Sequence, residues 1–142
     1  MFRFSIIIFA SLLSAGTIAG GLPSDTAVTP ENAIEYSISL KDLGSGDPET
    51  LLYQLQFSEK LGSCLAGRVQ TTLYAGSQEL SSSSMDYAVK TSSPSLLVHF
   101  PVKKHDMAVT IQYCCKPGVV PGCKRSLSIN SLKGFLRDSK GS

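Results

Sequence analysis

The sequence predicts an all-β fold: a small antiparallel β-sandwich, Ig-like or barrel-like, of about seven short strands with two disulfides and at most one short helix. Three observations lead to this prediction. Apolar and polar residues alternate over short segments, as in half-buried strands. Turn residues separate these segments at short intervals, which favours antiparallel neighbours because parallel crossovers need a dozen or more residues. Four cysteines, an even number, follow an export signal.

The first nineteen residues have the pattern of a cleaved secretory signal. Arg3 precedes an apolar run from Ile6 to Leu13 that is interrupted only by Ser11, and Thr17 and Ala19 place small side chains where a signal peptidase cuts. Spanning a bilayer takes about 20 apolar residues, so this run favours a signal over a membrane anchor. We therefore expect a secreted, extracellular protein that begins at Gly20 and has no transmembrane segment after cleavage.

The exported part has the length of one domain. Residues 1–19 are the predicted signal peptide, and residues 20–32 are a predicted flexible leader, because they contain Pro23 and Pro30 and little apolar periodicity. We place the single β-sandwich domain at residues 33–136. Residues 137–142 are then a flexible C-terminal tail.

The first half of the domain contains three predicted strands. Residues 34–41 alternate apolar and polar side chains, and turn residues at 44–48 end this strand. For residues 48–61, the sequence leaves a helix and a strand as alternatives. Asp47 and Pro48 resemble a helix start, whereas the alternation from Leu51 to Phe57 favours a strand. Residues 68–74 alternate again and form the third strand.

The second half continues the same period. We expect strands at 85–89, 96–100, 109–115 and 123–129, followed by a short helical turn at 132–136. The serine run 81–84 cannot pack a core and is predicted to be a flexible loop. Residues 103–106 are predicted to be a polar turn.

The cysteines are predicted to form disulfides and not a metal site, because their spacing lacks two close ligand pairs. Neighbours in a strand point to opposite faces, so Cys114 and Cys115 should have different partners. Cys115 and Cys123 each fall on the same strand face as the nearby apolar residues. This favours a Cys115–Cys123 disulfide and leaves Cys64 as the partner of Cys114. The loop 116–122 holds two prolines and two glycines. A bulge there would give the alternative, Cys64–Cys115 with Cys114–Cys123.

The charges are distributed unevenly along the chain. Residues 20–100 hold four basic and nine acidic groups, whereas residues 101–142 hold eight basic groups and two acidic ones. A basic segment can attract an anionic surface; alternatively, these are solvated cations on loops and strand edges. Within the segment, the candidate basic patch consists of Lys103, Lys104 and His105.

The candidate binding loop lies between residues 116 and 125. Two valines there are flanked by prolines and by cations, a composition that suits a contact surface; alternatively, the valines fold back on the core of a hairpin tip. The residues singled out are Lys116, Val119, Val120, Lys124 and Arg125. The loops at 44–48, 78–84 and 103–106 are further candidates.

Catalytic motifs are scarce. The sequence has no nucleophile elbow, no phosphate-binding glycine loop and no histidine pair at helical spacing, and it calls for no cofactor. An enzyme is therefore not favoured. The enzymatic alternative is a secreted ribonuclease-like hydrolase that uses His99 or His105 with a carboxylate.

A binding role follows from the predicted architecture, because rigid scaffolds present loops for contact. In size, export and cysteine number, the chain resembles the small cysteine-containing effectors that fungi and other colonising organisms secrete; no motif ties it to a named family. We expect an effector-like binding protein that contacts a protein or an anionic polymer outside the cell, and a nucleic-acid partner is not favoured. The second alternative is a carrier of a lipid or small apolar ligand between the sheets, lined by residues such as Leu55, Phe100 and Ile111.

Overall fold

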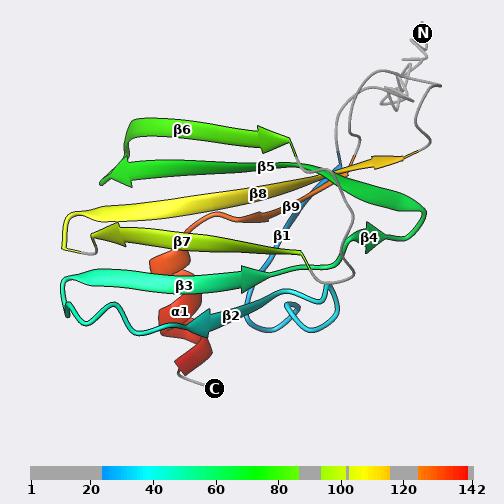
Figure 1. Cartoon of the computed structure of the whole chain (residues 1–142). Helices are drawn as coiled ribbons and strands as arrows, with labels where there is room; N and C mark the ends of the chain where they lie inside the picture. The colour runs from blue at the N-terminus through cyan, green and yellow to red at the C-terminus, as the bar shows by residue number, and fades with distance from the viewer. Residues whose placement is uncertain (1–23, 87–93, 102, 116–124, 141–142) are drawn as a thin grey trace, which may run out of the picture.

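The computed structural model describes residues 24–86, 94–101, 103–115 and 125–140. These residues are mostly β, in two sheets with one short helix (Figure 1), in agreement with the predicted β-rich class. In chain order the elements are β1 (Ser24–Ala27), β2 (Ser39–Asp42), β3 (Thr50–Gln56), β4 (Lys60–Leu61), β5 (Cys64–Ala75), β6 (Gln78–Asp86), β7 (Ser95–Pro101), β8 (His105–Cys115), β9 (Arg125–Ile129) and α1 (Leu132–Lys140).

The larger sheet has six strands in the order β1-β9-β8-β5-β4, with β6 also paired to β5. Its centre is the antiparallel pair β5–β8, whose register runs from Cys64 opposite Cys115 to Ala75 opposite His105. The pair β1–β9 is parallel, and the other pairs in this sheet are antiparallel. The long central pair therefore positions every other strand of the sheet.

The smaller sheet has three strands in the order β2-β3-β7, all antiparallel. β3 shows that residues 50–56 form a strand, as the alternation predicted: Tyr53 and Leu55 are buried, and the intervening Gln54 is half-buried. The helix-like signal at Asp47 and Pro48 belongs instead to a turn, in which the Thr50 amide donates to the Asp47 carbonyl at 3.1 Å. This turn leads the chain into β3.

Side chains from both sheets and from α1 form one hydrophobic cluster. Leu55 of β3, Phe100 of β7, Ile111 and Tyr113 of β8 and Leu132 of α1 are each at most 2% exposed. Burying a side chain of this size stabilises the fold by about 1.5–3 kcal/mol. The cluster therefore holds the two sheets and the helix together.

The Tyr113 hydroxyl ties β8 to the connection between β3 and β4. It donates a hydrogen bond of 2.8 Å to the Ser58 carbonyl. Burial raises the pKa of Tyr113 from 10.0 to about 12 because the phenolate would lose its hydration. Tyr113 is 0% exposed, and its hydroxyl is hydrogen-bonded, as buried polar groups generally are.

The N-terminal part of the domain differs from the sequence prediction. Residues 24–32, assigned to a flexible leader, contain β1 and place Val28 in the core. Asn32 closes the following turn, since its side chain accepts from the Thr29 amide and donates to the Ala27 carbonyl. The leader prediction was wrong for these residues because a short parallel edge strand is held by backbone pairing and needs no apolar alternation.

The strand predicted at 34–41 begins later. Residues 30–36 form turns, Ile34 is 89% exposed, and β2 starts at Ser39. Ser37 has φ of 57°, in the left-handed region, and the Ile38 amide donates to the Ala33 carbonyl at 2.9 Å. These local bonds interrupt the extended backbone that the alternation suggested.

Two polar segments also belong to regular structure. The serine run 81–84, predicted to be a flexible loop, lies within β6. An edge strand is held by its backbone bonds to one neighbour, so it needs no core-packing side chains. The polar turn predicted at 103–106 is shorter, because β8 begins at His105. The tail predicted from residue 137 is also shorter, because α1 continues to Lys140.

The disulfide prediction Cys64–Cys114 with Cys115–Cys123 was wrong, because Cys64 is bonded to Cys115. These two residues lie opposite each other in the β5–β8 register. Cys115 does continue the core-facing phase of β8, as predicted, but its partner on that face comes from β5 and not from the following segment. Cys114 is also disulfide-bonded, and Cys123 lies outside the described residues.

The Cys64–Cys115 bond closes a loop with a sequence separation of 51. Replacing both cysteines by serine should lower the free energy of unfolding by about 4 kcal/mol, because the unfolded chain regains the entropy of that loop. Urea denaturation measures the loss. The matched control is the double serine variant of Cys114 and Cys123, whose expected bond closes a much shorter loop and should cost about 2.5 kcal/mol. An equal loss in the two variants would contradict this assignment.

Replacing Tyr113 by phenylalanine should lower the free energy of unfolding by about 1 kcal/mol, because the Ser58 carbonyl loses its donor. Since the folded-state pKa of Tyr113 is raised, its contribution is present below pH 10 and is lost as pH rises towards about 12. Denaturation between pH 8 and 12 should show this loss in the wild type and less of it in Tyr113→Phe. Tyr74→Phe, at a half-buried position of β5, is the control that should keep the wild-type profile.

Candidate functional site

Loops of both sheets lie together at one end of the molecule, which we call the loop end. It comprises the β2–β3 loop (43–49), the β5–β6 turn (76–77) and the β7–β8 loop at Lys103 and Lys104. Thr50 lies opposite Pro101 in the smaller sheet, and Ala75 lies opposite His105 in the larger one. Both registers thus bring these loops to the same side, at the left of Figure 1. Two of the loops named from the sequence meet here.

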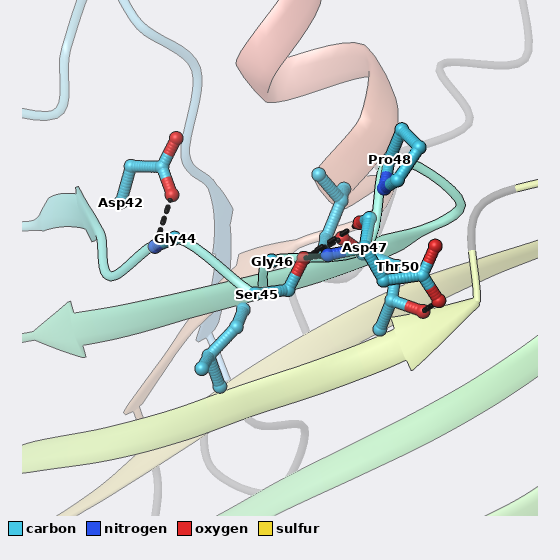
Figure 2. Close-up of a pocket in the computed structure, with 9 residues that line it drawn as sticks. Asp42, Gly44, Ser45, Gly46, Asp47, Pro48 and Thr50 are labelled. Carbon is cyan, nitrogen blue, oxygen red and sulfur yellow. Dashed lines mark hydrogen bonds between the residues drawn. The ribbon is translucent and has the colours of Figure 1, made fainter.

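The β2–β3 loop is folded on itself through short polar contacts (Figure 2). The Gly44 amide donates to Asp42 Oδ1 at 2.8 Å, and the Ser45 hydroxyl donates to the Thr50 carbonyl at 2.7 Å. Gly44 and Gly46 have φ of 69° and 73°, a conformation that costs other residues energy. The loop therefore has a defined shape before any partner binds.

Asp47 is the centre of this loop. Its Oδ1 accepts from the Glu49 amide at 2.9 Å, and its Oδ2 accepts from the Thr50 hydroxyl at 2.9 Å. These two hydrogen bonds stabilise the carboxylate and lower the pKa of Asp47 below its ordinary value of 3.8. At neutral pH the loop therefore carries a fixed negative charge.

A shallow cavity of about 320 Å³ lies against this loop. Its volume is at the lower limit of small-molecule pockets, and backbone and short polar groups provide much of its wall. Its lining residues are Asp42, Gly44, Ser45, Gly46, Asp47, Pro48, Thr50, Leu51 and Leu52. Its open shape and polar wall suit contact with polar groups of a partner.

The candidate basic patch lies beside this acidic loop. Lys103 and Lys104 are exposed, and His105 is half-buried as the first residue of β8. Lys103 Nζ lies 3.9 Å from Glu49 Oε1, and both side chains are about 70% exposed, so the ion pair contributes little stability. Because Asp47 and Glu49 are neighbours of the patch, the loop end carries mixed charges and is not a uniformly basic surface.

Of the candidate binding loop, the structure places only Arg125. Residues 116–124 of the candidate binding loop, including Lys116, Val119, Val120 and Lys124, lie outside the described residues. Arg125 is exposed at the start of β9, and its Nη1 comes near Gly62. Gly62 precedes Cys64, at the opposite end of β5 from the loop end. Arg125 and the basic patch thus lie at opposite ends of the β5–β8 pair.

The histidines named for a hydrolase lie in different sheets. His99 is exposed on β7 opposite Leu52, and His105 begins β8 opposite Ala75. Within the ranges that the structure describes, no group of three or more histidine, cysteine, aspartate or glutamate side chains could hold a metal ion. Those ranges also contain no helix long and apolar enough to cross a membrane.

A row of cations on α1 was not singled out from the sequence. Lys133, Arg137 and Lys140 are exposed and are spaced by four and three residues, so they share a helix face away from the buried Leu132 and Phe135. Their spacing was the available signal, but the sequence prediction placed only one helical turn there. Arg137 is also bonded to Asp138, at 3.2 Å.

Comparison with known proteins finds no family model and no curated protein that this sequence matches. The class of the protein therefore comes from its own geometry. It is a mostly β protein with two sheets, a cross-strand disulfide and a preformed polar loop cluster at one end.

The pKa of Asp47 provides a test of the loop geometry. Replacing Thr50 by valine removes one of the two hydrogen bonds to the carboxylate, so the pKa of Asp47 should rise towards 3.8. Carboxyl-carbon NMR between pH 2 and 6 measures both values. Because the folded-state pKa is lowered, the loop should keep its order above pH 3.8 and lose it as pH falls through the pKa of Asp47. An Asp47 pKa unchanged by Thr50→Val would contradict the arrangement.

Proposed function

We propose that this chain is a secreted, effector-like binding protein that acts by contact through its loop end. The observation that carries the proposal is the internal bonding of the β2–β3 loop around Asp47 and Ser45. A loop that is ordered before it binds loses less conformational entropy on association. Contact surfaces are also commonly loops held on a rigid scaffold.

The scaffold that we propose is a β-sandwich, in which the smaller sheet packs face to face with the larger one. The shared hydrophobic cluster of the two sheets supports this arrangement. A filled interface between the sheets also supports a contact role over the carrier alternative, because Leu55, Phe100 and Ile111 are already at most 2% exposed.

Secretion is supported by two independent features. One is the signal-like segment 1–19. The other is the Cys64–Cys115 disulfide, since such bonds persist mainly in oxidising compartments. We propose Cys123 as the partner of Cys114, because it is the one cysteine left by the observed bond.

The mixed charge of the loop end supports a protein as the partner. Three carboxylates, Asp42, Asp47 and Glu49, accompany the two lysines of the patch. A polyanion would be repelled by these acids, whereas a protein surface can match both signs in one interface. We therefore place an extracellular protein ahead of an anionic polymer.

A charge-swap variant tests the loop end as the contact surface. Glu49→Lys with Lys104→Glu keeps the net charge but inverts the local pattern, so capture of extracellular proteins by the immobilised chain should fall at least about tenfold, the equivalent of 1.4 kcal/mol. Glu59→Lys with Lys60→Glu makes the same swap at β4, at the other end of β5, and should leave capture unchanged.

Heparin serves as the polyanion probe in the same experiment. The wild type should bind heparin weakly at physiological ionic strength, because loop-end carboxylates oppose it. If the variant with the loop-end charge swap captures proteins as well as the wild type does, the loop end is not the contact surface. Tight heparin binding that the swap abolishes would favour the polymer partner instead.

A further inference from the structure

β6 is an outer strand of the larger sheet, at the top of Figure 1. It pairs with β5 along one side, and no other described strand pairs with it. All nine of its residues, Gln78–Asp86, are exposed. Among the described elements, its second edge is therefore a row of backbone groups available for pairing.

The other outer strands are short or carry lysine or proline, whereas β6 has as protection only its two acidic side chains and the register shift in its pairing with Leu73 and Tyr74 of β5. β1 and β2 have four residues each, and β4 has two, one of which is Lys60. β7 is bounded by Pro94 and Pro101. Short length, lysine and proline are the usual protections of an edge. Residues 78–86 include no lysine, arginine or proline, so β6 is a long edge without them.

A small apolar cavity lies under this edge, on the core side of the sheet. The register places Ser83 opposite Thr71 and Met85 opposite Val69, and Leu96 of β7 contributes from the other sheet. The cavity has a volume of about 110 Å³. One water molecule occupies about 30 Å³ in the liquid. The cavity therefore has the volume of about three or four water molecules, which is about the size of a valine or leucine side chain.

The charge of the edge is acidic. Its two ionisable side chains are Glu79 and Asp86. Asp86 is bonded to Arg68 of β5 at 2.8 Å, whereas no ion pair within the described residues includes Glu79. A second copy of this chain would bring two further acids to the edge, and like charges in adjoining strands oppose pairing. A segment that carries a cation complements the edge better.

We propose that the β6 edge binds an extended segment of a partner protein, which adds a strand to the larger sheet. In such complexes the backbone provides affinity, and pockets for alternate side chains provide specificity. The segment places one aliphatic side chain in the cavity under Met85 and a lysine or arginine near Glu79. This site adjoins the β5–β6 turn of the loop end but consists of other residues, and it does not depend on the function proposed for the loop end.

The probe is a blocked peptide of alternating valine and threonine with one terminal lysine. Titrated into ¹⁵N-labelled protein, it should shift the amide signals of β6 and of Thr71. The same peptide with alternate backbone amides methylated should bind at least about tenfold more weakly, because each missing donor removes a ladder bond. A peptide with glutamate in place of lysine should also bind more weakly.

A matched pair of protein variants locates the site. Ser83→Lys places a cation on the cavity side of β6 and should abolish peptide binding. Ser84→Lys makes the same change on the opposite face of the same strand and should retain it. The amide signals of β8 report whether each variant is folded. The loop-end charge swap should leave peptide binding unchanged, so the two proposals can fail separately.

Three results would overturn the proposal. The first is the absence of any β6 shift up to millimolar peptide. The second is equal binding of the methylated peptide, which would show that no strand is added. The third is a concentration-dependent shift of β6 without peptide, which would make a second copy of this chain the occupant.

Discussion

The antiparallel pair β5–β8 is the constraint on which the rest of the structure depends. Its register runs from the Cys64–Cys115 disulfide at one end to Ala75 and His105 at the loop end. Val69 and Ile111, opposite each other, both face the core. Every other strand of the larger sheet pairs with this unit directly or through β9. A one-residue slip of either strand against the other would turn the core face of that strand to solvent, so the core itself specifies the register.

The disulfide and the loop end lie at opposite ends of this pair, and this separation has a physical consequence. The disulfide restrains the end of the pair at which β4 ends and β9 begins. Tyr113 adds its hydrogen bond to Ser58 near this end. The loop end has no such cross-link among the described residues. Its order comes from local bonds around Asp47 instead. Its surface can therefore vary in sequence while the packed frame stays the same.

Apolar alternation predicted core-packing strands such as 96–100 and favoured a strand over a helix at 50–56, because one buried face imposes a period of two. It could not predict β1 or residues 78–84 of β6, which are held by backbone bonds and have no alternation of apolar and polar residues. It also misplaced the first strand, where left-handed Ser37 and the bond from Ile38 to Ala33 are local events without a periodic signal. The favoured disulfide pairing was wrong, and Cys64–Cys115 of the alternative was right, for a related reason: strand register is set by tertiary pairing, and the spacing of cysteines does not encode it. Likewise, Lys103 and Glu49 are 54 positions apart in sequence (103 − 49) and meet only through the β3–β7 pairing.

The two proposed surfaces differ in how they would recognise a partner. The loop end offers fixed side-chain charges and a shallow polar cavity, so its selectivity depends on matching charge and shape, and its affinity should weaken with salt. The β6 edge offers backbone donors and acceptors that any extended chain can use, so its selectivity must come from Glu79 and from the cavity under Met85. Backbone pairing is less sensitive to salt than exposed ion pairs. A chain that engaged one partner with both surfaces would therefore retain contact through β6 under conditions that weaken the loop end, and the rigid β5–β8 pair would keep the two contacts at a constant separation.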